Sequence, residues 1–144
     1  MKKWREIMHH IKQMFESHAQ KGKVDVDALA ANVEEIFMCA QTCQMCADAC
    51  LGAQDVKPLV RCIRINHDCG DVCHVTAAML SRLTEPDWDI ITGQVRSCVQ
   101  SCKVCAAECE RHASKHEHCR LCAETCRKCA ETCESMLAEV PVRK

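Results

Sequence analysis

Apolar residues recur along the chain at steps of three and four positions, the spacing of an α-helix with one buried face. The first such stretch ends near Lys21-Gly22, and four longer ones cover about 25–51, 55–83, 88–113 and 117–138. The apolar positions of the first stretch are Trp4, Ile7, Met8, Ile11, Met14 and Phe15. The pattern predicts a short amphipathic helix followed by four helices, each roughly 30–40 Å long.

The residues between these stretches are ones that begin and end helices. Asp25 is suited to an N-cap, Gly52 follows the first long helix, and Pro58 fits the first turn of the second. Because the turns are short, we predict an all-α protein, an antiparallel up-down four-helix bundle preceded by a short N-terminal helix. We expect a single domain over residues 1–144, with the amphipathic helix in 1–22 and the bundle in 25–138.

A cysteine motif occurs once in each of the four long helices. CAQTCQMCADAC (39–50), CVQSCKVCAAEC (98–109) and CAETCRKCAETC (122–133) share one pattern. A degenerate copy, CIRINHDCGDVC (62–73), has Asn66 where the second cysteine would stand. The spacing of the copies indicates two similar helical hairpins, as expected from a duplicated αα unit.

Within a complete motif the cysteines are separated by steps of four, three and four. At about 100° per residue, their sulfurs stay within an arc of about 60° on one helix face. A bundle turns such a stripe toward its own axis, so we expect all sixteen cysteines to line one axial channel. They are Cys39, Cys43, Cys46, Cys50, Cys62, Cys69, Cys73, Cys98, Cys102, Cys105, Cys109, Cys119, Cys122, Cys126, Cys129 and Cys133.

Composition excludes several classes of protein. Sixteen cysteines in 144 residues is a density typical of disulfide scaffolds, but four glycines and three prolines are too few for such loop-rich folds. Basic residues are interspersed with acidic ones and not clustered, and the net charge is −1, which argues against a nucleic-acid partner. The N-terminal residues lack the apolar run of a signal peptide, and we expect no membrane span. A cytoplasmic location, where thiols stay reduced, follows.

Dense thiols in a reducing compartment indicate metal binding, and the helical placement favours Cu(I). Zinc and iron–sulfur sites gather four ligands around one centre, usually from loops or tight turns. Cu(I) is a soft ion that thiolates select. If each sulfur bridges two ions and each ion takes two sulfurs, the channel holds roughly one Cu(I) per cysteine. One Cu⁺ per thiolate also leaves the interior near neutral.

The cysteine stripes do not reach both ends of the helices, so the two ends of the bundle differ. One end is predicted to be an apolar plug. Its residues are Leu29, Val33, Ile36, Ala77, Leu80, Leu83, Trp88, Ile91, Val95, Met136, Leu137 and Val140. At the other end Cys50, Cys62, Cys109 and Cys119 reach the helix tips.

The turn RHASKHEHC at that second end carries three histidines. His112 continues the stripe of Cys109 by one step, and His118 adjoins Cys119. We predict that His112 and His118 are metal ligands at the mouth of the channel, whereas His116 can equally be solvated.

The other metal-binding residue types are expected to be structural. His67 and His74 fall off the stripe and should be exposed, and Met38 and Met45 should pack between helices. His9, His10, His18, Met8 and Met14 are interpreted as packed or exposed side chains. Asn66 occupies a core position without a thiol, where it can hydrogen-bond a sulfur or a backbone group, or contact a peripheral ion.

The repeated Cys-x3-Cys-x2-Cys-x3-Cys pattern over residues 25–138 resembles the bacterial copper storage proteins. The resemblance implies a four-helix bundle whose core is filled with Cu(I). Because we expect no signal peptide, the chain resembles the cytosolic branch of the family more than the exported one. That branch has an N-terminal helix, which residues 3–21 would match, and forms homotetramers. Its mouth histidines correspond best to His112 and His118.

Four other interpretations compete with copper storage, and we expect no enzyme activity. A redox enzyme would use CxxC pairs such as Cys43/Cys46, but a reactive pair needs an exposed helix N-terminus, and these lie inside helices. A metallothionein-like sink for Zn or Cd uses the same ligands. A copper detoxification chaperone needs only one or two sulfurs. A purely structural cysteine core would be more safely built from Ala, Val or Leu.

Overall fold

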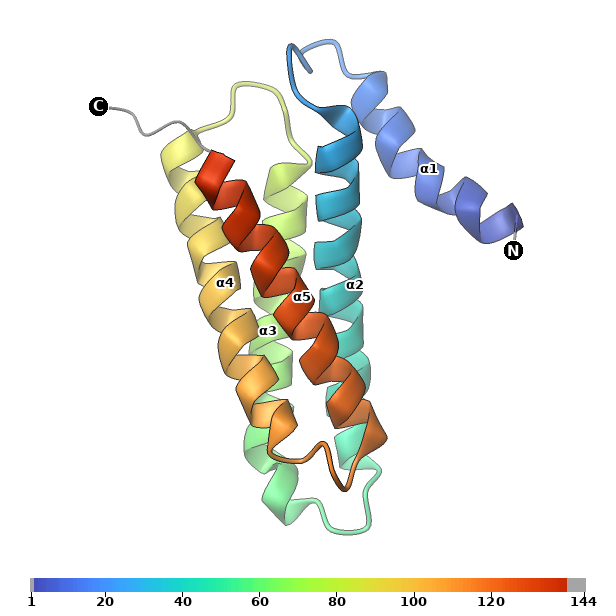
Figure 1. Ribbon diagram of the computed structural model, residues 1–144, viewed down its shortest axis with the longest axis vertical. Coiled ribbons are helices and arrows are strands. Elements are labelled where there is room, and N and C mark those ends of the chain that lie inside the picture. Colours follow the sequence, from blue (N-terminus) through green and yellow to red (C-terminus); the bar gives the residue numbers. More distant parts are fainter. Residues whose placement is uncertain (1, 140–144) are drawn as a thin grey trace.

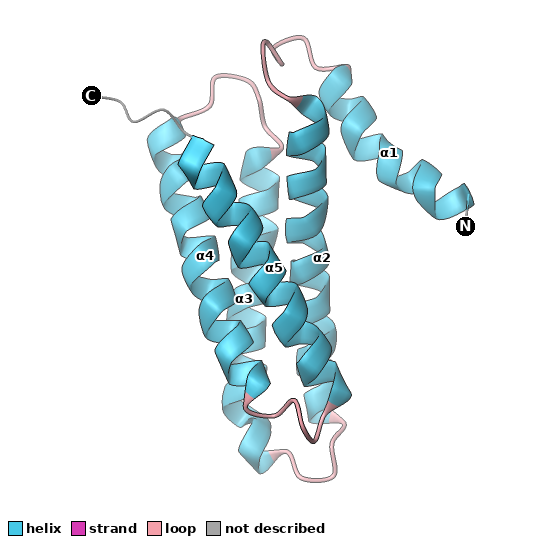
Figure 2. Ribbon diagram, in the orientation of Figure 1, coloured by secondary structure: helices cyan, strands magenta, loops and turns pink. Residues whose placement is uncertain are grey.

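A computed structural model describes residues 2–139, without the side chains of residues 4, 7 and 8. Every regular element in this range is a helix (Figures 1 and 2). The elements are α1 (Lys2–Glu16), α2 (Val26–Leu51), the short 3₁₀ helix η1 (Lys57–Leu59), α3 (Val60–Leu80), α4 (Trp88–Glu110) and α5 (Glu117–Glu139). The predicted class, a four-helix bundle preceded by a short helix, is confirmed. Within residues 2–139, no helix combines the length and apolarity needed to cross a membrane.

Acidic residues cap the N-termini of two of the long helices, and the sequence predicted the one at Asp25. The side chain of Asp25 accepts a hydrogen bond from the Ala28 amide at 3.1 Å, and Gly52 follows the last turn of α2. Asp87 accepts from the amides of Asp89 and Ile90, at 3.1 Å each. These bonds satisfy amide groups that the helix itself leaves free.

Three helices end earlier than the apolar spacing predicted. α1 ends at Glu16, where the hydroxyl of Ser17 donates to the Met14 carbonyl at 2.8 Å. α3 ends at Leu80 and α4 at Glu110, before the predicted 83 and 113. Leu83 is nevertheless buried, because it packs into the hydrophobic core from the connection that follows α3. Apolar spacing therefore marks which residues are buried more reliably than where a helix stops.

Each bundle helix packs against two antiparallel neighbours. α2 contacts α3 and α5, and α4 contacts the same two helices, so the four surround one axis (Figure 1). α3 packs tightly against α2 at Gly70, where a Cβ would lie 2.9 Å from Gln44 Nε2 and 3.4 Å from the Ala40 carbonyl oxygen. The most extensive contacts are within the α2–α3 and α4–α5 hairpins, in agreement with the duplicated unit that the repeat predicts.

The apolar plug lies at the end of the bundle where α2 and α4 begin. Val33, Ile36 and Ala77 are inaccessible to solvent, and Val95 is 3% exposed. Leu80 is also buried, while Leu29, Ile91, Met136 and Leu137 are half-buried. The prediction for Trp88 is wrong: it is 43% exposed, because as the first residue of α4 it lies beyond the layer that the other helices cover. Val140 lies outside the described residues.

α1 leaves the bundle at the plug end and points away from it (Figure 1). Its C-terminal part packs on the bundle, where Phe15 is 3% exposed and Ile11 is partly buried against the core. An ion pair from Lys12 Nζ to Asp27 Oδ1, at 2.7 Å, joins it to the first turn of α2. Met14, predicted as part of the apolar face, is exposed. The predicted side chains of Trp4, Ile7 and Met8 lie outside the described residues.

Phe15 should therefore contribute to the stability of the plug. We expect Phe15→Ala to lower the free energy of unfolding by about 2 kcal/mol, the value of burying one large apolar side chain. Urea unfolding followed by circular dichroism measures the change. The matched control is Met14→Ala, on the adjacent exposed position, which should stay within about 0.5 kcal/mol of the parent. Equal losses for both variants would contradict the docking of α1 through Phe15.

Candidate metal centre

The structure brings all sixteen predicted cysteines together in the interior of the bundle. Cys46 is 2% exposed and the other fifteen are inaccessible. All sixteen are free thiols. The helical stripes therefore form one channel along the bundle axis, with thiols supplied by α2, α3, α4 and α5.

Neighbouring sulfurs in the channel lie at hydrogen-bond distance across the helices. Cys43 Sγ is 3.6 Å from Cys126 Sγ, which joins α2 to α5. Cys73 Sγ is 3.6 Å from Cys102 Sγ and 3.8 Å from Cys98 Sγ, which joins α3 to α4. Each contact needs a proton on one of the two sulfurs, so protonated thiols can link neighbouring helices through weak S–H···S hydrogen bonds.

The inner thiols form overlapping groups whose sulfurs all lie within 4.8 Å of one another. One group is Cys39, Cys69, Cys73 and Cys102, and a second is Cys39, Cys43, Cys69 and Cys126. A third group is Cys43, Cys105, Cys122 and Cys126, and a fourth is Cys73, Cys98, Cys102 and Cys129. Because single cysteines belong to two groups, their thiolates can bridge neighbouring ions. Isolated tetrahedral sites would not share ligands in this way.

Asn66 lies in the channel among the sulfurs, with its amide fully hydrogen-bonded. Its Nδ2 donates to the Cys62 carbonyl at 2.8 Å and approaches Cys62 Sγ at 3.3 Å and Cys109 Sγ at 3.4 Å. Its Oδ1 accepts from the thiols of Cys122 at 3.0 Å and Cys105 at 3.4 Å. The predicted hydrogen bonds of Asn66 to sulfur and backbone are thus present, and they span from the mouth cysteines to the inner ones.

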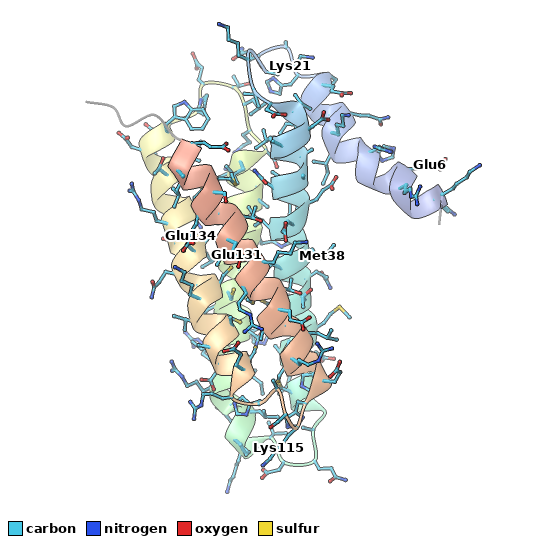
Figure 3. All side chains as sticks on the ribbon, in the orientation of Figure 1. Glu6, Lys21, Met38, Lys115, Glu131 and Glu134 are labelled. Atoms are coloured by element: carbon cyan, nitrogen blue, oxygen red, sulfur yellow. The ribbon has the colours of Figure 1, made fainter. Side chains whose placement is uncertain are left out.

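His118 joins the outermost thiols at the mouth of the channel. Its Nε2 lies 3.4 Å from Cys50 Sγ, and together with Cys46 and Cys119 these residues form a group within 4.8 Å. His118 in turn lines a hollow of about 560 Å³ between the α2–η1 connection and the α4–α5 turn. His112, His116 and His118 all line it, with Lys115 at the same end of the molecule (Figure 3).

The other two mouth histidines make contacts that the sequence did not predict. His112 Nε2 lies 3.3 Å from Glu108 Oε1, so its ring is held by a carboxylate and not by a sulfur. The ring of His116 packs at 5.3 Å from that of His118. All three imidazoles therefore share the hollow, and His118 also groups with Cys46, Cys50 and Cys119.

The protonation states at the mouth follow from burial. Burial, reinforced by the neighbouring His116, lowers the pKa of His118 below its usual value, so its imidazole is neutral at pH 7 and keeps a lone pair for a metal. Burial raises the pKa of the Cys119 thiol to about 12, with Cys50 adding to the effect. The mouth therefore offers a neutral nitrogen ligand beside a thiol that must lose its proton to bind.

The predicted packing of Met38 and Met45 is wrong, because both lie on the outer face of α2. They are 57% and 64% exposed, and Figure 3 shows Met38 projecting from the surface. Ala40 and Ala47 are buried instead, since closely packed helices accept only small side chains at their contact edge. His67 and His74 are exposed as predicted, and the ring of His74 meets Phe37 edge-on at 5.5 Å.

Sequence reasoning missed Glu108, which is 6% exposed and surrounded by charged partners. From the sequence alone, an acidic residue next to a core cysteine is expected on the solvent-exposed face of the helix. The only signal in the sequence was its spacing of four from His112, which places the two side chains together on a helix.

Fold and channel together define a class of protein: a helical bundle that gathers many soft ligands in a solvent-inaccessible core and can hold a cluster of thiophilic ions. Comparison with known proteins gives the particular family. The sequence model described as "Copper storage protein" matches residues 25–138, so the chain belongs to the copper storage protein family.

Solved structures of similar proteins agree with this assignment. The copper storage protein Ccsp from Streptomyces lividans, loaded with 10 copper equivalents, is 44% identical with a TM-score of 0.86, over 90% of this chain and 99% of that one. A cytosolic copper storage protein from Streptomyces lividans, with five coppers, is 47% identical with a TM-score of 0.78, over 80% and 96%. Cu(I)-bound BsCsp3 is 30% identical with a TM-score of 0.68, over 76% and 98%.

Proposed function

We propose that this chain stores Cu(I) in the cytosol, with the sixteen cysteines as ligands, and that the ions enter beside His118 and His112. The observation that carries the proposal is the continuous set of buried thiols with shared, overlapping groups. A transfer protein needs one or two exposed thiols, whereas this arrangement removes many ligands from solvent and so favours retention.

The expected capacity is roughly one Cu(I) per cysteine. Thiolates bridging two ions, each ion bound by two sulfurs, give this ratio, and a Cu⁺ for each lost proton keeps the core near neutral. The copper-loaded structures of family members support multiple ions in such a core. Asn66 in place of a cysteine and the nitrogen ligands at the mouth can move the count by one or two.

The proposal extends to how the protein is organised. The chain acts as one domain, with the bundle of residues 25–138 as the storage unit and residues 1–22 as an accessory helix. It assembles as a homotetramer, as the family resemblance implies, and it catalyses no reaction. The cytosolic location rests on the description of the Streptomyces lividans relative.

Anaerobic titration of the fully reduced protein with Cu(I), in competition with a strong chromophoric Cu(I) chelator, tests the proposal. We expect the protein to take up many ions, close to one per thiol, before the absorbance of the Cu(I)–chelator complex appears. Saturation at one or two ions would support a chaperone instead. Repeating the titration in the presence of Zn(II) separates the metallothionein-like alternative, which requires Zn(II) to be retained against Cu(I).

Copper loading should release protons, because the mouth thiol is protonated at neutral pH. The pKa of Cys119, raised to about 12 by burial, means that Cu(I) displaces a proton throughout the range from pH 6 to pH 8. Apparent affinity should therefore rise with pH, by about tenfold per pH unit for each proton displaced.

An indicator dye in weakly buffered solution counts the protons released for each Cu(I) added. We expect about one per ion for most of the titration. Loading without proton release would contradict a channel of protonated thiols. The matched blank is Cu(I) added to the chelator and dye alone, which corrects for protons released by the reagents.

A further inference from the structure

A buried carboxylate lies beside the mouth, at a position that the sulfur channel does not use. Glu108, in the last turn of α4, is 6% exposed, and it is the only acidic side chain buried to this degree among residues 2–139. Removing a carboxylate from water is unfavourable unless partners replace the lost hydration. Its contacts should therefore indicate what it does.

The two oxygens of Glu108 have different partners. Oε2 lies 3.4 Å from Arg61 Nε, near the start of α3, and 3.3 Å from the guanidinium of Arg111, just after α4. Oε1 lies 3.3 Å from His112 Nε2. The arginines thus occupy one oxygen and leave the other to the imidazole, so Glu108 ties His112 to the end of α3.

This arrangement fixes which nitrogen of His112 carries the hydrogen. A carboxylate paired with two guanidinium groups accepts hydrogen bonds and donates none. The hydrogen between Glu108 and His112 is therefore on Nε2, which leaves the lone pair on Nδ1 free. Metal-binding histidines commonly donate their second ring N–H to a carboxylate, which holds the ring and makes the other nitrogen a better ligand.

We propose that Glu108 is a positioning residue for copper uptake, which holds His112 as the Nε2–H tautomer so that Nδ1 can take Cu(I) in the hollow that it shares with His118. The inference rests on the proposed function, in which the histidine end is the mouth. Uptake is then ligand exchange: a bond from Cu(I) to its carrier is replaced by a bond to Nδ1. That bond is replaced in turn by one to a thiolate, as the thiol proton leaves to water.

A simple structural brace between α3 and α4 is the competing explanation, and the variants separate the two. In Glu108→Gln the side chain keeps its size, but its amide can donate to Nε2 and favour the opposite tautomer, with Nδ1 blocked. His112→Ala removes the ligand itself, and the double variant tests whether the two act together. The matched control is Glu110→Gln, which breaks the exposed ion pair of Glu110 with Arg127 at the same end of α4.

The measurements use the reduced full chain, mixed rapidly with chelator-buffered Cu(I), with thiolate–copper absorbance followed over time. We expect Glu108→Gln and His112→Ala to slow uptake by a similar factor, about 10-fold, and the double variant to be no slower than either. Final copper content should be unchanged in Glu108→Gln and Glu110→Gln and lower by no more than about one ion in His112→Ala, and Glu110→Gln should load at the parental rate. Nitrogen NMR of the metal-free protein should show His112 as the Nε2–H tautomer in the parent and not in Glu108→Gln.

Several outcomes would overturn the inference. Glu108 would be a structural brace if the slowing factors of the two single variants multiply in the double variant. The same conclusion would follow if the His112 tautomer is unchanged in Glu108→Gln. If His112→Ala takes up copper at the parental rate and to full content, neither His112 nor Glu108 takes part in uptake, and the proposed storage function is unaffected. A parent protein that takes up only one or two ions would instead reject storage itself.

Discussion

Removing copper from the loaded protein is expected to lower its thermal unfolding midpoint by about 20 °C or more, while the metal-free bundle stays folded at room temperature. A ligand that binds only the folded state at a hundred times its Kd adds about 2.7 kcal/mol for each site. Three such sites add about 8 kcal/mol, and each kcal/mol moves the midpoint of a chain of this size by about 2–4 °C. A channel that holds more ions can exceed this shift.

The metal-free protein should remain folded because its core does not depend on the ions. The plug provides an apolar layer around Val33, Ile36 and Ala77, and the thiols pair with one another through S–H···S bonds. Every buried side-chain nitrogen and oxygen among residues 2–139 has a hydrogen-bond partner. Small metal-binding domains such as zinc fingers lack such a core and unfold without metal.

Circular dichroism at 222 nm, recorded during heating of matched metal-free and copper-loaded samples under anaerobic conditions, measures this shift. A metal-free sample with little helix would show that the channel needs copper to fold. Equal unfolding midpoints for the two samples would show that copper does not bind between the helices of the folded bundle. Adding the chelator to the metal-free sample controls for effects of the reagent.

Asn66→Ala is expected to destabilise the metal-free protein by about 3 kcal/mol. The change removes an amide that bonds two thiols and approaches two other sulfurs, and it leaves a cavity in a fully buried site. Urea unfolding of the reduced protein measures the loss. Asn32→Ala, at the other asparagine of the chain and on a half-buried position, is the matched control and should cost much less.

The companion variant Asn66→Cys restores the four-three-four spacing on α3. It should bind about one more Cu(I) than the parent, because the new sulfur joins Cys62, Cys105, Cys109 and Cys122, which now contact the amide. An unchanged copper content would indicate that this level of the channel is already filled through other ligands. A large loss of copper from Asn66→Ala would show instead that the amide itself takes part in binding.

The sequence determined the parts of this protein that depend on periodicity. The steps of four and three put every cysteine on the inner face of its helix, and the plug positions Val33, Ile36, Ala77 and Val95 followed from the same period. Side chains at these steps point to one side of a helix whatever surrounds it. The fold class, the buried thiols and the cap at Asp25 could therefore be predicted from the chain alone.

Only the tertiary structure decided how side chains on different helices meet. It placed Met38 and Met45 outside, because contact with the neighbouring helices was taken by Ala40 and Ala47. It left Trp88 half exposed at the rim of the plug, and it buried Glu108 between the arginines of α3 and of the turn after α4. Lateral packing and charge pairing depend on helix rotation and on the path of the turns, and neither follows from the period of a single helix. The sequence thus set the sulfur lining of the channel, and the packing of the four helices set the chemistry of its mouth.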